Sequence, residues 1–436
     1  MMIENEIQRK IEDFRELGLQ KYIPRESNVY IVDNMVTTII GARRSGKSFR
    51  TVQIADEYIN KKAIQSIHQI CLLDFDNPIL SSIKSVDLRL IQNTFLKMNP
   101  DYNLRTTILF ILDEIHKIMG WEEYVIDLSK NPNWKVIVTG SSSKLLKHDI
   151  STELRGKAIS SIIFPLTFKE FLKFKNFQHQ TGSTKGVAEL QRRFDEFLKW
   201  GAFPAITNVE INTKEVLLRE YFDTMILKDI IQRFNISKPR QCTQLYYFLL
   251  SNIGKPHSYT SAFNYIKQSG YKTSRDTIRE YINWAVDSWL IFLMPIFSDS
   301  IKEQERNYKK LYCIDWALSN KNSLVWDGHY SRSLENIVFI SLYQKWPRVN
   351  YYLTRSGRKE VDFIAVNNAG IPEMAVQVCM DISNPETFKR ELVPLIATAK
   401  YFNTKENVII TYNQEKSLKE QGVSIKAIPA WKWLLN

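Results

Sequence analysis

Residues 41–48 combine two glycines, a lysine and a serine in a spacing that suits the binding of phosphate groups. They follow the pattern G-x-x-x-x-G-K-[ST]; an apolar, β-branched run over 34–40 precedes them, and apolar residues at helical spacing follow over 49–59. Gly41 and Gly46 allow the backbone to approach closely, so that N–H groups at the positive end of a helix can meet negative oxygens. The sequence therefore predicts a phosphate-binding loop between a strand and a helix; the alternative is a chance match in a surface loop.

The loop predicts roles for individual residues in binding a nucleoside triphosphate with Mg²⁺. We expect Lys47 to reach the β and γ phosphates and the Ser48 hydroxyl to bind Mg²⁺. Arg43 and Arg44 either contact phosphate or DNA, or are solvated charges. The residues expected to line the bound nucleotide are Gly41, Ala42, Arg43, Arg44, Ser45, Gly46, Lys47, Ser48 and Phe49.

A second apolar run, over 107–112, ends in two carboxylates, Asp113 and Glu114. Phosphoryl transfer needs a metal anchor and a group that positions water, and the end of a nearby strand usually supplies both. We expect Asp113 to hold Mg²⁺ through water and Glu114 to orient or activate the attacking water. The alternative is an acidic N-cap after a buried strand.

Hydroxyl groups follow the next predicted strand, over 135–138, at Thr139, Ser141 and Ser142. A hydroxyl at this point could sense the γ phosphate or steady the water, or the segment is an ordinary serine-rich turn. Arg155 has a functional interpretation, as an arginine finger toward a neighbouring subunit or as an in-chain sensor. The alternative is an ordinary surface arginine. The catalytic residues predicted in this way are Glu114, Lys47, Arg155, Thr139 and Ser141.

The chain has 436 residues, which is too long for one ordinary core and predicts several domains. Apolar runs at 34–40, 70–75, 107–112 and 135–138 alternate with helical patterns, which indicates an α/β fold with a parallel sheet. The predicted domains are a nucleotide-binding core over 1–164, a helical lid over 165–238, a winged helix-turn-helix over 239–300 and a third α/β domain over 301–436.

The winged helix-turn-helix is predicted from three helix-like segments between 242 and 297, with Ser274 as N-cap of the last and a strand after it. Lys272, Arg275 and Arg279 would then face a double-stranded DNA groove, although such modules also bind proteins. Strands predicted beyond Tyr308 lie at 311–314, 349–353, 361–366, 374–378 and 408–411.

Composition narrows the classes of partner. The chain carries 59 Lys and Arg against 47 Asp and Glu, a net charge of +12, which favours a polyanion without identifying one. The most apolar stretch, 289–297, contains a proline and is far shorter than a membrane span, and the acidic N-terminal residues do not fit a secretion signal. The four cysteines stand far apart, so a cytoplasmic protein with reduced thiols and no cysteine-based metal site is expected.

Taken together, the motifs resemble the archaeal-type AAA-like P-loop ATPases. The motifs that carry the resemblance lie at 41–48, 112–115, 120–121, 138–143, 154–156, 165–171, 201–204, 228–231 and 358–363. The resemblance implies ATP and Mg²⁺ as cofactors, an ATPase core, a winged-helix middle and a C-terminal domain shaped like a restriction endonuclease.

In the endonuclease-like fold, a helix carboxylate, a strand aspartate and a Glu-x-Lys pair assemble a Mg²⁺ site. Glu335 and Asp362 match the first two positions, but Gln377 and Cys379 stand where the Glu and Lys are expected. A neutral amide cannot supply the missing charge, so we expect a binding or assembly domain without nuclease activity, unless Glu373 substitutes.

The leading hypothesis is an ATPase in which Mg-ATP closes the core against the lid and hydrolysis moves domains that bind DNA or a protein partner. One alternative is a signalling switch that turns over slowly and recruits a protein. Another is an ATP-regulated nuclease. The sequence leaves oligomer formation open.

Overall fold

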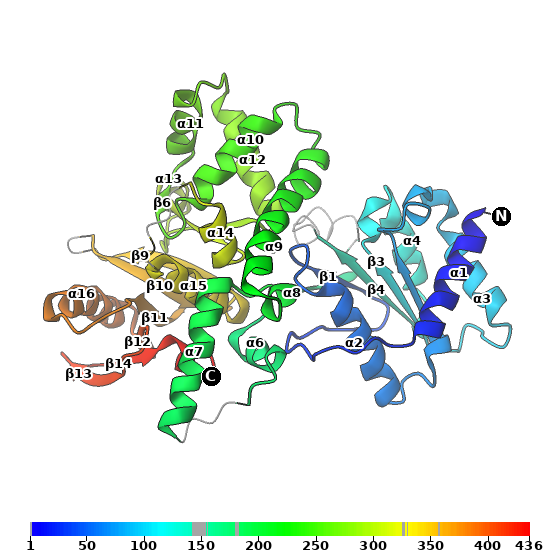
Figure 1. Cartoon of the computed structure of the whole chain (residues 1–436), viewed down its shortest axis with the longest axis horizontal. Coiled ribbons are helices and arrows are strands. Elements are labelled where there is room, and N and C mark those ends of the chain that lie inside the picture. The colour runs from blue at the N-terminus through cyan, green and yellow to red at the C-terminus, as the bar shows by residue number, and fades with distance from the viewer. Residues whose placement is uncertain are drawn as a thin grey trace. The chain divides into compact units, whose positions relative to one another are not determined.

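The computed structural model describes residues 2–141, 154, 156–178, 183–324, 328, 330–355 and 358–436. Contacts divide the chain into two compact units, Met1–Pro165 and Leu166–Asn436 (Figure 1). The prediction of an α/β fold with a parallel sheet near the N-terminus and a further sheet in the C-terminal part is confirmed. Among the described residues, no helix has the length and apolar character that a membrane crossing requires.

The first unit is built on a five-stranded sheet in which every pair of neighbouring strands is parallel, in the order β2-β3-β4-β1-β5. The strands are β1 (Val36–Ile40), β2 (Ile70–Asp74), β3 (Ile108–Asp113), β4 (Trp134–Gly140) and β5 (Ala158–Ile162). Sequence patterning located the first four within a few residues but missed β5, whose Ser160 and Ser161 interrupt the apolar run. Because β4 lies between β3 and β1, the ends of these three strands meet at one edge of the sheet.

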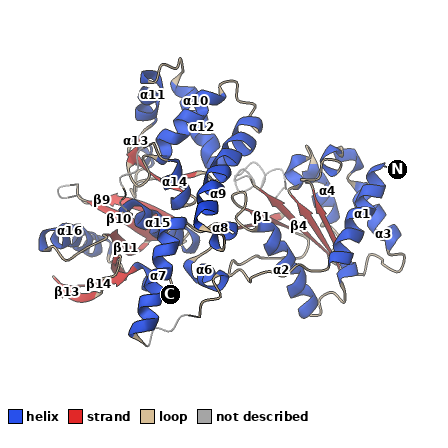
Figure 2. Cartoon of the chain, in the orientation of Figure 1, coloured by secondary structure: helices blue, strands red, loops and turns tan. Residues whose placement is uncertain are grey.

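Helices cover both faces of this sheet (Figure 2). The helices are α1 (Met2–Leu17), α2 (Lys47–Asn60), α3 (Arg89–Met98) and α4 (Trp121–Leu128), with short 3-10 turns between them. Ile54 and Ala55 of α2 share a core with the β3 side chains Leu109 and Ile111. The alternate residue Phe110 points to the other face, where its ring centroid lies 5.7 Å from that of Phe95 in α3. The alternation along β3 thus matches a strand buried on both faces.

The second unit begins with helices, as predicted for 165–235. They are α6 (Phe168–Phe174), α7 (Thr184–Trp200), α8 (Pro204–Thr207), α9 (Ile211–Thr224) and the π-helix η6 (Met225–Gln232). Thr167 and Glu170 form a capping box at the start of α6. The interpretation of this region as a lid stays a prediction.

Three helices and a small antiparallel sheet follow. They are α10 (Pro239–Leu250), α11 (Tyr259–Gln268) and α12 (Arg275–Asp287), with β6 (Pro256–His257), β7 (Ile291–Met294) and β8 (Lys309–Cys313) in the order β6-β8-β7. The Ser274 hydroxyl accepts a hydrogen bond from the Thr277 N–H at 3.0 Å, so Ser274 caps α12 as expected. The sequence assigned the β8 residues to the C-terminal domain, whereas β8 pairs with β6 and β7; the expected boundary at 300 therefore falls between paired strands.

The C-terminal sheet has six strands in the order β13-β14-β12-β11-β10-β9. The strands are β9 (Arg348–Leu353), β10 (Glu360–Val366), β11 (Pro372–Val378), β12 (Glu406–Thr411), β13 (Lys416–Glu420) and β14 (Val423–Pro429). The accompanying helices are α13 (Ile301–Arg306), α14 (Trp316–Asn322), α15 (Ser331–Lys345), α16 (Pro385–Phe402) and α17 (Ala430–Trp433). One face packs Val361 and Ala375 against Leu392 and Leu395 of α16.

A buried aspartate joins the helices to the rest of this unit. Asp315 caps α14 by accepting hydrogen bonds from the N–H groups of Ala317 and Leu318, and it also accepts one from the Ala202 N–H at 2.6 Å. Gly201 has φ +78°, and a Cβ at this position would lie 2.3 Å from the Asp315 Oδ1. The glycine is therefore required both for the backbone angle and for the close approach.

Candidate nucleotide-binding site

The loop between β1 and α2 presents backbone rather than side chains. Gly46 is the N-cap of α2 with φ 101° and has no side chain that could cap the helix, so the positive end of α2 is open to an anion. Gly41 has φ 151°, and a Cβ there would lie 2.2 Å from the Ile163 carbonyl oxygen. Glycine is needed at both ends of the loop for the backbone to fold in this way.

Lys47 and Ser48 lie in the first turn of α2 and point toward the end of β3. The Lys47 Nζ donates to the carbonyl oxygens of Gly41 and Ala42, each at 3.2 Å, and lies 3.5 Å from the Glu114 Oε1. The Ser48 Oγ donates to the Asp113 Oδ2 at 2.6 Å. The structure thus brings together the four residues for which the sequence predicted phosphate, metal and water contacts.

Asp113 is held by hydroxyl groups from two sides. Thr139, near the end of β4, donates its hydroxyl to the Asp113 Oδ1 and accepts the Glu114 N–H at 3.0 Å. Burial raises the pKa of Asp113 above its ordinary value, against the opposing effect of the Ser48 and Thr139 hydrogen bonds. A nearby cation would stabilise the ionised form of such a buried carboxylate, so Asp113 fits the role of a metal anchor.

Glu114 is almost buried and has the left-handed φ of 55°, which turns its side chain toward Lys47. Its second oxygen, Oε2, lies 3.3 Å from the His116 Nδ1. Burial alone would raise the pKa of Glu114, but the positive charges of Lys47 and then His116 outweigh it, and the pKa lies below its ordinary value. Glu114 is therefore ionised at neutral pH; His116 was not singled out from the sequence, although it stands two residues after the carboxylate pair.

The outer residues of the loop have different surroundings. The Arg43 Nη1 lies 4.0 Å from the Asp76 Oδ2, and Asp76 is also paired with Lys117. Ala42 and Ser45 are buried, whereas Arg44 is exposed, and Phe49 is 50% exposed. The predicted contacts of these residues with nucleotide stay predictions.

Arg25 holds the loop from outside, and sequence reasoning missed it. Its Nη1 donates to the Ser45 carbonyl and its Nη2 to the Phe164 carbonyl, both at 2.7 Å. Its backbone N–H donates to the Gln53 Oε1 of α2 at 2.9 Å. This arginine ties the phosphate-binding loop to the segment after β5, and a single arginine in an irregular segment carries no pattern that would reveal this.

Ser141 is buried and directly follows β4. Ser142 and Arg155, for which sensor and arginine-finger roles were predicted, lie outside the described residues. Of the hydroxyl residues predicted after the 135–138 strand, Thr139 is the one whose described hydrogen bonds reach Asp113 and Glu114.

These residues fit a magnesium nucleotide. Within the described parts of the chain, no group of three or more His, Cys, Asp or Glu side chains could hold a metal alone. Mg²⁺ typically takes one or two protein ligands and completes its shell with phosphate oxygens and water, and Ser48 beside Asp113 offers such a partial site.

Comparisons with known proteins agree with this geometry. A family described as an AAA domain matches residues 33–172, and a domain of unknown function, DUF8612, matches residues 191–325. A Methanocaldococcus jannaschii protein, "Uncharacterized protein MJ1544", is 32% identical over 429 residues, covering 95% of this chain and 92% of that protein. The chain belongs to this family of archaeal-type AAA-like P-loop ATPases. A Haemophilus influenzae member, "Uncharacterized protein", is 28% identical over 380 residues, covering 86% of this chain and 91% of that protein.

Among solved structures, a Walker-type ATPase of Pyrococcus abyssi aligns with a TM-score of 0.39 at 15% identity, covering 73% of this chain and 94% of that chain. The ORC1 protein of Aeropyrum pernix, solved in complex with DNA, aligns with a TM-score of 0.31 at 12% identity, covering 73% of this chain and 91% of that chain.

A second charged cluster lies in the C-terminal domain of this family member. The Lys310 Nζ lies 2.6 Å from the Glu335 Oε1, 3.0 Å from the Glu360 Oε1 and 3.3 Å from the Asp362 Oδ1. Burial would lower the pKa of Lys310, but these carboxylates raise it well above its ordinary value. The structure thus brings Glu335 and Asp362 together as the endonuclease resemblance implied, with a lysine from β8 between them that the sequence did not reveal.

The other residues that the endonuclease resemblance singled out are Gln377, Glu373 and Cys379, and each has its own contacts. The Gln377 Oε1 accepts the Asp362 N–H at 2.7 Å, and its Nε2 donates to the Glu391 Oε2 at 2.8 Å. Glu373 contacts Asn367 and Lys405 instead, so the described contacts do not connect it to the Lys310 cluster. The Cys379 thiol donates to the Asp381 carbonyl.

Proposed function

We propose that this protein binds Mg-ATP at the P-loop and hydrolyses it to change the conformation of domains that bind DNA or a protein partner. The observation that carries the proposal is the convergence of Lys47 and Ser48 from α2 with Asp113 and Glu114 from the end of β3. A lysine, a hydroxyl and two carboxylates at the mouth of a parallel sheet are the groups that phosphoryl transfer to water requires.

Each residue has one task in this proposal. Lys47 binds the β and γ phosphates in place of the carbonyl oxygens that it now contacts. Mg²⁺, held by Ser48 directly and by Asp113 through water, would neutralise charge on the phosphates. Glu114, kept ionised by Lys47 and His116, orients the attacking water and accepts its proton. Thr139 positions both carboxylates by binding the Asp113 side chain and the Glu114 backbone.

DNA is the first partner class to test. Lys272, Arg275 and Arg279 are exposed at and before the start of α12, the position from which a winged helix reads a groove. Arg279 lies 5.3 Å above the Tyr259 ring and Arg275 lies 5.7 Å above the Phe263 ring, so aromatic residues of α11 orient both side chains. A slow switch that recruits a protein remains the second candidate, because the same face would also suit an acidic protein.

The Lys310 cluster argues against the third candidate, an ATP-regulated nuclease. A lysine ammonium already lies among Glu335, Glu360 and Asp362, where the endonuclease resemblance implies a metal ion. Plasmid that stays intact with Mg²⁺ or Mn²⁺ would agree with this view, and cleavage would contradict it.

The decisive experiment measures nucleotide binding by calorimetry and phosphate release, with and without duplex DNA. We expect Lys47→Ala to lose binding, and Glu114→Gln to keep binding but lose at least a hundredfold in turnover. Lys97→Ala, which removes an exposed lysine of the same unit, is the matched control and should behave as wild type. Wild-type turnover in Lys47→Ala would refute the proposal, and turnover that duplex DNA does not change would favour the switch.

A further inference from the structure

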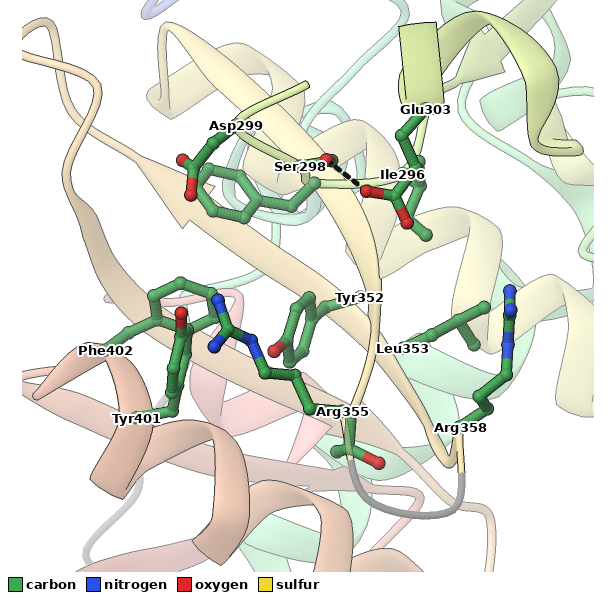
Figure 3. A pocket seen from close by; sticks show the side chains of 12 residues that line it. Ile296, Ser298, Asp299, Glu303, Tyr352, Leu353, Arg355, Arg358, Tyr401 and Phe402 are labelled. Carbon is green, nitrogen blue, oxygen red and sulfur yellow. Dashed lines mark hydrogen bonds between the residues drawn. The ribbon is translucent and has the colours of Figure 1, made fainter. Parts of the chain in front are cut away.

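A cavity of about 320 Å³ opens in the second unit (Figure 3). Its walls come from the segment between β7 and α13, the end of β9 and the C-terminal end of α16. No role assigned so far involves it. Its size lies at the lower end of the range for small-molecule sites and suits a ligand about as large as one nucleotide.

Aromatic rings form one side of the cavity. The Phe402 ring centroid lies 4.9 Å from that of Tyr352 and 4.7 Å from that of Tyr401, in both cases with the rings nearly perpendicular. Tyr352 belongs to the buried core of the C-terminal sheet, whereas Tyr401 is 47% exposed. The rings are thus anchored in the core, and Tyr401 has an aromatic surface over which the Arg355 guanidinium lies.

Two arginines lie at different ends of this cavity. The Arg355 Cζ is 4.4 Å from the Tyr401 ring centroid, and Figure 3 shows Arg358 beyond Leu353, on the side of Glu303. Both side chains are exposed, and the contact that the structure describes for Arg355 is with the Tyr401 ring. Two guanidinium groups near one aromatic surface would suit successive phosphates of one strand.

Carboxylates also reach the cavity, from Asp299 and Glu303. They disfavour a simple anion such as free phosphate, which would be repelled and would leave the rings unused. A purely apolar ligand would desolvate four charged groups without compensation. A nucleobase attached to a sugar-phosphate backbone satisfies all three features, because its ring stacks, its phosphates meet arginine and its amino groups donate to a carboxylate.

We propose that this cavity binds an unpaired nucleotide of a single-stranded nucleic acid. The Arg355 guanidinium leaves the Tyr401 ring for a flanking phosphate, and the base stacks on the ring face that it exposes. Arg358 contacts the phosphate on the other side, and Asp299 accepts a hydrogen bond from an exocyclic amino group. This site is separate from the P-loop and does not depend on ATP hydrolysis, so it can be tested whether or not the ATPase proposal holds.

The test is fluorescence anisotropy of the full chain with a labelled single-stranded oligonucleotide of mixed sequence and with the same sequence as a duplex. We expect Tyr401→Leu to weaken single-strand binding about tenfold and to leave duplex binding unchanged. Arg355→Ala should weaken single-strand binding and reduce the slope of log affinity against log salt by about one. Arg348→Ala removes an exposed arginine at the other end of β9 and should change affinity less than Arg355→Ala.

Several results would overturn the proposal. They are no binding of the single strand, equal losses in Tyr401→Leu for single strand and duplex, and equal losses in Arg355→Ala and Arg348→Ala. AMP separates the two sources of a nucleotide, since displacement of the oligonucleotide by AMP at equal concentration would assign the cavity to a free nucleotide instead.

Discussion

Replacing Lys310 by methionine tests how the C-terminal domain tolerates its buried charges. The Lys310 side chain is 2% exposed, so water cannot take its place beside the carboxylates. Glu335 and Asp362 are 17% and 16% exposed, and each would lose its ammonium partner; Glu360, at 35%, can still be hydrated. Glu335 keeps the hydrogen bond from the Tyr312 hydroxyl and Asp362 keeps that from the Val378 N–H, so what is lost is the compensating positive charge. Breaking a buried ion pair in this way generally costs about 3–5 kcal/mol.

The measurement is equilibrium urea unfolding followed by circular dichroism, with hydrogen exchange of β8, β10 and α15 to locate the change. We expect Lys310→Met to lower the free energy of unfolding at pH 7 by about 3–5 kcal/mol. Glu360→Gln is the matched control: it removes one partner of the same lysine at the hydrated side, and its cost should stay near 1 kcal/mol or less, about that of an exposed ion pair.

The pH dependence separates charge from packing. Burial raises the pKa of Glu335 and the Lys310 ammonium opposes this effect, so in Lys310→Met the folded-state pKa of Glu335 would lie further above that of the unfolded chain. Stability contributed by protonation is then present at low pH and lost as pH rises through the folded pKa. The difference from wild type should therefore be smaller at pH 5 than at pH 7. A variant as stable as wild type at pH 7, or a deficit that does not change with pH, would refute this account.

Three further predictions concern other parts of the chain. Gly201→Ala should lower the free energy of unfolding, measured by thermal unfolding, by about 2–4 kcal/mol, because its Cβ would meet the Asp315 Oδ1 at 2.3 Å and its φ is +78°. The control is Gly270→Ala: this position has φ +87° and nothing within 4 Å of the added Cβ, so the variant should lose only about 1 kcal/mol through backbone strain. Burial lowers the pKa of His257 to about 4, so stability should fall as pH drops from 6.5 through 4, by at most about 3 kcal/mol, and His257→Phe should remove that slope. Arg25→Met should raise the Kd for ATP at least tenfold in calorimetry, because the Ser45 and Phe164 carbonyls lose charge-assisted hydrogen bonds; an unchanged Kd would contradict a positioning role.

Local sequence patterns predicted four strands of the first sheet because each of them can be recognised from its own residues and those that follow it. Each of β1 to β4 is an apolar run followed by polar residues, and the phosphate-binding loop has its own spacing of glycines. The strand order was not available from such patterns, yet it decides the site, because β4 brings Thr139 between the P-loop and Asp113. A parallel sheet was therefore predictable, whereas the hydrogen bonds of Thr139 were not.

Contacts between distant segments account for most of what the sequence missed. Arg25 reaches Phe164 across 139 residues, and Lys310 reaches Asp362 across 52 residues. The strand β8 shows a related limit: its apolar pattern predicted a strand but could not reveal that the strand pairs with β6 and β7. The residues next to a charge or a strand in the sequence do not reveal which distant residue or strand will be its partner.

Two of the buried lysines, Lys47 and Lys310, show why the residue type alone does not define a site. Lys310 has three carboxylates within 3.3 Å, so internal anions already outnumber its charge and hold it in place. Lys47 is nearly as buried, at 5% exposed, but it has one carboxylate at 3.5 Å and otherwise donates to two neutral carbonyl oxygens. Phosphate oxygens make stronger, charge-assisted hydrogen bonds than carbonyls do, so they can displace these partners, whereas no anion gains by replacing three carboxylates. This difference supports our proposal that Lys47 binds a ligand, whereas Lys310 has the surroundings of a lysine that stabilises its own domain.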